Sequence, residues 1–203
     1  MIDRHLIGMQ NRLLGPPGKF LADRGIRADW ITLFGFMVGL CAVPLLALSA
    51  FIPALLCILF NRLLDGLDGA VARQLGPTDR GAFLDIAFDF FFYGAVPFGF
   101  VLADPDANAL AAALLLLSFI GTGSSFLAFA AISHKRGEGI AEYPGKGLRF
   151  VGGLTEGAET IAIFTAMCLL PSAFAALAYL FAFLAALTTV TRWRWGWYSF
   201  GPK

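Results

Sequence analysis

The sequence predicts an all-α integral membrane protein with six transmembrane helices preceded by an N-terminal interfacial amphipathic helix. Of the 203 residues, 58% are hydrophobic and 14% are charged, about half the charged fraction usual in soluble domains. Segments 30–61, 107–133 and 160–191 contain no Asp, Glu, Lys or Arg. Because roughly 20 apolar residues span a bilayer, these runs favour membrane spans over a large buried helical core.

Each predicted element follows from the distribution of these runs. Residues 1–27 mix apolar and basic side chains without forming a signal peptide, as expected for an interfacial helix. The first uncharged run is long enough for two helices joined by a turn near 49–53. The third is long enough for two helices joined near 170–172.

One span near 81–102 and another within 107–133 complete a six-helix bundle over residues 28–192. Residues 193–203 then form a cytoplasmic tail. Since no linker, repeat or low-complexity segment divides the chain, we expect a single membrane-embedded domain over residues 1–203.

The basic residues support this count. With six spans, every group of Lys and Arg lies at one membrane face, and the opposite turns carry only Asp104 and Asp106. The positive-inside rule then predicts a multi-pass inner-membrane protein with both termini in the cytoplasm. The acidic segment described next faces the cytoplasm in this topology.

Four carboxylates interrupt the apolar pattern. Asp65 and Asp68 are three residues apart and Asp85 and Asp89 four apart, so each pair shares one helix face. Carboxylates at membrane depth are costly, and four of them repel one another unless cations neutralise them. Oxygen ligands without Cys or His favour two divalent cations, Mg²⁺ or Mn²⁺, over zinc.

Small residues and one arginine follow the first acidic pair. Gly66, Gly69 and Ala72 leave one helix face bare, so a nucleotide or pyrophosphate can approach the backbone. Arg73 is suited to a phosphate oxygen. Carboxylates, cations and arginine together indicate phosphoryl transfer.

The segment 65–73 (DGLDGAVAR), followed by Gly81, Asp85 and Asp89, resembles the D-x-x-D-G-x-x-A-R…G-x-x-x-D-x-x-x-D motif of the CDP-alcohol phosphotransferase (CDP-alcohol phosphatidyltransferase) family. The spacer of seven residues before Gly81 is one shorter than the usual form. The predicted six-helix layout also matches the family's architecture.

The resemblance implies roles for individual residues. The ligands of a two-metal site would be Asp65, Asp68 and Asp85, with Asp89 close to the metals and also the general base for the acceptor hydroxyl. The residues contacting the CDP moiety would be Asp68, Gly69, Ala72, Arg73, Gly81 and Thr32.

The implied reaction transfers a phosphatidyl group from CDP-diacylglycerol to a small polar alcohol and releases CMP. Family members that use glycerol phosphate often carry Lys after the last Asp, and inositol-phosphate enzymes carry Arg, whereas this chain has Phe90. The segment Tyr93 to Pro97 resembles the phosphatidylserine synthase branch, which favours serine. Helix packing with a proline kink is the alternative interpretation of that segment.

Other polar residues are candidates for the acceptor pocket: Tyr93, Lys135, Arg136, Lys146, Arg149, Glu156 and Glu159. The basic ones are equally expected from positive-inside charge and contact with lipid headgroups. If the fifth helix begins near Arg149, the two glutamates lie inside the membrane, where carboxylates are functional candidates. They would either hold an ammonium group of the acceptor or brace Arg62 and Arg73.

Two other function classes use the same carboxylates. One is a CDP-aminoalcohol transferase with diacylglycerol as acceptor, and the other a non-enzymatic divalent-cation channel or carrier. A channel needs a continuous polar path, which the nearly uncharged first, fourth and sixth helices do not supply. The expected partners are membrane lipids and a second copy of the chain in a homodimer, with no nucleic acid.

Overall fold

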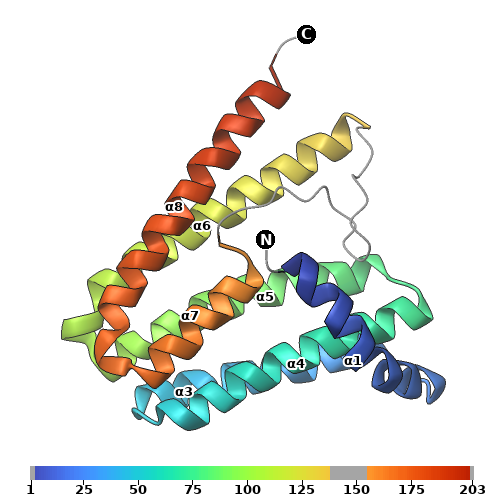
Figure 1. Ribbon diagram of the computed structural model, residues 1–203, viewed down its shortest axis with the longest axis horizontal. Coiled ribbons are helices and arrows are strands. Elements are labelled where there is room, and N and C mark those ends of the chain that lie inside the picture. The colour runs from blue at the N-terminus through green and yellow to red at the C-terminus, as the bar shows by residue number, and fades with distance from the viewer. Residues whose placement is uncertain (1–2, 138–154, 202–203) are drawn as a thin grey trace.

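A computed structural model describes residues 3–137 and 155–201, with side chains described from residue 12 onward. Within these ranges the chain is helical and has no strand (Figure 1). The elements are α1 (Asp3–Asp23), α2 (Ala28–Leu40), α3 (Ala42–Ala47), α4 (Phe51–Leu75), α5 (Asp79–Ala103), α6 (Pro105–Lys135), α7 (Gly157–Leu169), η1 (Pro171–Ala173) and α8 (Phe174–Ser199).

The all-helical membrane character is confirmed, but the count of six spans is not. In the described part of the chain, four stretches are long and apolar enough to cross a membrane: 28–47, 79–103, 105–135 and 171–199. Helix α4 has sufficient length but carries the charges of the acidic motif. Helix α7 has 13 residues, about 20 Å at 1.5 Å per residue, which is shorter than a usual span.

Helix boundaries largely follow the predicted turns. Ser49 has a positive φ of 56° just before α4 begins, and the 3₁₀ turn η1 separates α7 from α8. One expectation was wrong, since α7 begins at Gly157 rather than near Arg149. Helix α8 continues to Ser199, so most of the predicted cytoplasmic tail is helical.

The apolar core surrounds the middle of α5. Its largest fully buried side chains include Phe92, Phe100, Phe164 and Phe174, and the rings of Phe100 and Phe174 stack with centroids 4.5 Å apart. Helices α6 and α8 run side by side on one flank, while α4 lies along another edge of the molecule (Figure 1). The buried aromatic rings thereby fix α5 against α3, α6 and the C-terminal helices.

Close helix contacts hold the acidic segment in place. Helix α2 packs against both α4 and α5, and α1 packs against α4. A Cβ atom added at Gly35 of α2 would lie 3.0 Å from Leu64, and one added at Gly18 of α1 would lie 2.7 Å from Ala70. Because these glycines lack a side chain, α1 and α2 approach the motif helix closely.

Candidate active site

Three of the four motif carboxylates converge across α4 and α5. Asp65 on α4 and Asp85 and Asp89 on α5 each offer one oxygen, and these oxygens all lie within 4.8 Å of one another. The start of α5 is fixed by Thr78, whose hydroxyl accepts a hydrogen bond from the Gly81 backbone N–H at 3.0 Å. The spacing of four then places both α5 carboxylates on one helix face.

Asp68 is arranged differently from the other three. It is 6% exposed, and its Oδ2 accepts a hydrogen bond from the Thr32 hydroxyl of α2 at 2.5 Å. The same hydroxyl also lies 3.1 Å from the Ala28 carbonyl oxygen, one turn earlier in α2. Thr32 therefore ties α2 to the motif helix at a carboxylate, which gives this predicted nucleotide-contacting residue a defined position in the site.

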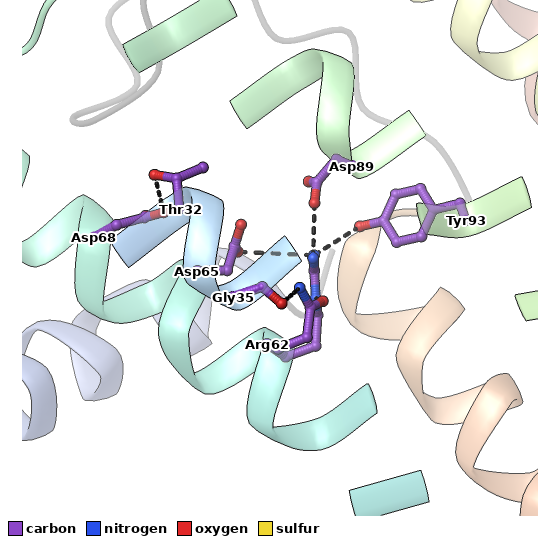
Figure 2. Close-up of polar contacts among 8 residues, drawn as sticks. Thr32, Gly35, Arg62, Asp65, Asp68, Asp89 and Tyr93 are labelled. Carbon is purple, nitrogen blue, oxygen red and sulfur yellow. Dashed lines mark hydrogen bonds and ion pairs between the residues drawn. The ribbon is translucent and has the colours of Figure 1, made fainter. Parts of the chain in front are cut away.

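Arg62 lies inside the carboxylate cluster, although the motif does not include it. Its Nη2 is 2.8 Å from Asp89 Oδ1 and its Nη1 is 3.8 Å from Asp65 Oδ2. The Tyr93 hydroxyl lies 3.4 Å from Nη1. Figure 2 shows the guanidinium pointing toward these three groups from α4. One arginine thus bridges the two acidic helices.

Asn61 fixes the position of Arg62. Its Oδ1 accepts a hydrogen bond from Arg62 Nε at 2.8 Å, and its Nδ2 donates to the Gly35 carbonyl at 2.9 Å. We had not assigned Asn61 to the site from the sequence. A usable signal was present, because residues 61 and 62 precede Asp65 by four and three positions and so share its helix face.

The site has the chemistry that a hard divalent cation requires. A pocket between α2, α4 and α5 is lined by Thr32, Gly35, Phe36, Asn61, Arg62, Asp65, Asp68, Asp85, Phe88 and Asp89. Its acidic donors are all carboxylate oxygens, with no Cys or His among these lining residues. This donor set and the convergence of three carboxylates fit Mg²⁺ or Mn²⁺.

Three of the predicted CDP-contacting residues, Gly69, Ala72 and Arg73, lie near the C-terminal end of α4. Arg73 is exposed, and a Cβ added at Gly69 would lie 3.3 Å from its Nη1, so the guanidinium folds over that glycine. Ala72 is half-buried beside them. Gly81 faces α2 instead, where an added Cβ would lie 3.5 Å from Asp29 Oδ1.

The predicted acceptor residues do not gather in the carboxylate pocket. Tyr93 reaches it through Arg62, whereas Arg136 donates to the Ser199 and Phe200 carbonyl oxygens at the end of α8. Lys135, the last residue of α6, is exposed. Lys146 and Arg149 lie outside the described residues.

Glu156 and Glu159 form a capping box at the start of α7. The Glu159 carboxylate accepts from the Glu156 backbone N–H at 3.1 Å, and the Glu156 side chain accepts in return from the backbone of Glu159. The depth expected from a helix starting near Arg149 was wrong, since both residues lie in the first turn. Capping satisfies backbone donors that have no helical partner there.

Comparisons with known proteins agree with this geometry. A family model described as CDP-alcohol phosphatidyltransferase matches residues 26–193. The chain is 52% identical to inner membrane protein YnjF of Escherichia coli (strain K12), covering 95% of this chain and 93% of that protein. It is 31% identical to the archaetidylinositol phosphate synthase of Pyrococcus horikoshii, covering 86% of each.

Solved structures give the same result. The phosphatidylinositol phosphate synthase of Mycobacterium tuberculosis with CDP-DAG bound superimposes with a TM-score of 0.73 at 25% identity, covering 92% of this chain and 94% of that one. The same enzyme in complex with manganese and citrate has a TM-score of 0.71 at 25% identity, covering 91% and 88%. The acidic motif, the helical fold and these matches agree, and the chain belongs to the CDP-alcohol phosphatidyltransferase family.

Proposed function

We propose that the protein transfers a phosphatidyl group from CDP-diacylglycerol to a small polar alcohol in the membrane, with release of CMP. The convergence of Asp65, Asp85 and Asp89 within 4.8 Å carries this proposal. Membership of the family and the likeness to a synthase with CDP-DAG bound support it.

Each site residue has a role in the proposed mechanism. Asp65, Asp68, Asp85 and Asp89 would hold two divalent cations, Mg²⁺ or Mn²⁺, which when bound offset charge on the transferring group and the leaving CMP. Asp89 takes the proton of the acceptor hydroxyl as that oxygen attacks the β-phosphorus.

The remaining motif residues hold the nucleotide. Arg73 donates to a phosphate oxygen of the CDP moiety, which approaches the backbone at Gly69 and Ala72. Thr32 keeps the carboxylate of Asp68 in place. Gly81 allows the close approach of α5 to Asp29 of α2, and its contact with the nucleotide stays a prediction.

The acceptor assignment shifts away from serine. The curated relative in Pyrococcus horikoshii is an archaetidylinositol phosphate synthase, and the similar solved structures are of a phosphatidylinositol phosphate synthase. None of these comparisons supports serine. We therefore place inositol phosphate ahead of serine among the small polar alcohols to be tested, even though Phe90 differs from the Arg expected in inositol-phosphate enzymes.

The test is CMP release from purified protein in lipid nanodiscs, supplied with Mg²⁺ and labelled CDP-diacylglycerol. Inositol phosphate, glycerol phosphate and serine are added one at a time, and EDTA serves as the metal-free control. We expect CMP to form with one acceptor and to disappear with EDTA. CMP formed from CDP-choline and diacylglycerol instead would identify an aminoalcohol transferase. Absence of CMP in every reaction, together with Mn²⁺ flux into liposomes, would identify a channel or carrier.

We further propose that residues 1–203 form one inner-membrane domain with six crossings, cytoplasmic termini and a cytoplasm-facing site, assembled as a homodimer. The crossings beyond the four long apolar stretches would be α4, which packs against α1 and α2, and α7, which packs against α4 and α8. Cysteines introduced at Ser49 and Gly76, at opposite ends of α4, test the topology in intact cells. An impermeant maleimide should label the first and not the second.

A further inference from the structure

We propose that Arg62 is a built-in counter-ion of the carboxylate cluster. In this role it positions Asp89 for the acceptor and weakens cation binding by the same carboxylates. The positioning part rests on the function proposed above, whereas the effect on cation binding does not. Arg62 lies outside the family motif described above.

The contacts of Arg62 differ from those of a mobile surface ion pair. Its side chain is 17% exposed and its contact with Asp89 Oδ1 is 2.8 Å long. Nε is held by Asn61 at 2.8 Å, and Asn61 is itself bonded to the Gly35 carbonyl at 2.9 Å. The guanidinium carbon lies 5.0 Å from the centroid of the Phe92 ring.

These contacts come from three helices, so the guanidinium is fixed before any ligand arrives. Asn61 lies on α4, Gly35 on α2, and Asp89 and Phe92 on α5. Because the charge is held by packing and hydrogen bonds on several sides, we expect it to stay in place when cations bind. It then contributes to the electrostatics of both the empty and the loaded site.

A fixed positive charge has two opposite consequences. It repels a divalent cation entering the cluster and occupies one oxygen of Asp89, so it lowers cation affinity. It also orients Asp89, and a misplacement of about 1 Å in a catalytic group can cost about 10²-fold in rate. Removal of Arg62 should therefore tighten cation binding while slowing turnover, a combination that simple loss of folding does not produce.

The experiment measures Mn²⁺ binding by electron paramagnetic resonance on the full-length protein in nanodiscs, without CDP-lipid. For Arg62→Gln we expect at least about fivefold tighter Mn²⁺ binding, since fivefold is the upper end for an exposed charge pair and the Arg62 side chain is mostly buried. Arg62→Lys keeps the charge and should stay within about twofold of wild type, on the same reasoning. Arg194→Gln, which removes an arginine stacked on Tyr198 of α8, is the control for net charge and should bind Mn²⁺ like the wild type.

Turnover is measured on the same preparations as CMP release. We expect turnover to fall by about 10²-fold in Arg62→Gln. The loss of turnover in Arg62→Lys should be smaller, because an ammonium group still pairs with Asp89 but lacks the several planar donors of the guanidinium. Unchanged or weaker Mn²⁺ binding by folded Arg62→Gln would overturn the counter-ion role. Full turnover in that variant would overturn the positioning role.

Two further outcomes keep the test decisive. If Arg62→Gln does not elute as a folded species in size-exclusion chromatography, Arg62→Lys decides: wild-type Mn²⁺ affinity with reduced turnover supports the proposal, and any other pair of results overturns it. If wild-type protein releases no CMP with any acceptor, the proposed function fails. The Mn²⁺ measurement still decides the counter-ion role in that case.

Discussion

Two polar regions of this protein are built in opposite ways. In the carboxylate pocket, the Thr32 hydroxyl and the Arg62 guanidinium reach carboxylates on other helices or across the cluster. In the contact between α6 and α8, the Thr122 hydroxyl donates to the Phe119 carbonyl and the Thr189 hydroxyl to the Ala185 carbonyl, each within its own helix. The second region is called here the α6–α8 seam.

The difference separates a reactive site from a packing surface. Hydroxyls bonded to their own helix are satisfied locally, so the seam can pack closely without needing a partner or a ligand. Charged groups that face one another across helices are satisfied only while those helices keep their arrangement. Arg192 is an exception within the seam, since it donates across to the Thr122 carbonyl at 2.9 Å.

The largest expected effect comes from the pocket. Asp89→Asn should lower turnover by about 10²- to 10⁴-fold because a general base is lost, while binding of labelled CDP-diacylglycerol is largely retained. Asp106→Asn, in the exposed first turn of α6, is the matched control and should keep wild-type turnover. Equal turnover in the two variants would remove Asp89 from the catalytic role.

A pair of threonines tests the comparison directly. Thr32→Val leaves the buried Asp68 carboxylate without its cross-helix donor, and loss of a hydrogen bond to a charged group predicts about a 10- to 100-fold drop in kcat/KM for CDP-diacylglycerol. Thr189→Val removes a bond confined to α8 and should leave kcat/KM unchanged. A similar drop in both variants would mean that the two regions do not differ in the way described.

Substitutions in the α6–α8 seam should change the stability of the protein rather than its turnover. A Cβ added at Gly121 would lie 3.0 Å from Thr189 Oγ1 and 3.1 Å from its Cγ2. Gly121→Ala should therefore lower stability by about 1–3 kcal/mol through overpacking, measured as thermal unfolding in detergent. At Gly196 on α8 the nearest atom is 3.8 Å away, so Gly196→Ala should show no loss. A stable Gly121→Ala variant would show that the seam adjusts easily.

The smallest effect is expected at the end of the seam where α6 and α8 both finish. Arg136→Gln removes two hydrogen bonds to the Ser199 and Phe200 carbonyls, worth about 0.5–1.5 kcal/mol each at most. Turnover per folded molecule should not change. A raised KM for the acceptor alcohol would instead restore Arg136 to the acceptor pocket predicted from the sequence, and thermal unfolding with acceptor titration distinguishes the two outcomes.

Features set by local spacing could be predicted from the sequence. The turn at Ser49, the start of α5 near Gly81 and the break before α8 follow from apolar runs and turn residues. The pairing of Asp85 with Asp89 on one face follows from helical periodicity. The predicted start of α7 was wrong because no uninterrupted apolar pattern marks where this helix begins. The two glutamates of its capping box were therefore interpreted as carboxylates at membrane depth.

The sequence by itself determined the membrane class, most helix boundaries and the family motif, because hydropathy and short-range spacing fix these properties within a single helix. Only the tertiary structure decided that Asp68 bonds Thr32, 36 positions away, and that Arg62 bridges to Asp89, 27 positions away. It also separated Arg136 from the pocket. Such contacts depend on how helices are rotated and crossed against one another, and side-chain packing across the whole bundle sets that geometry.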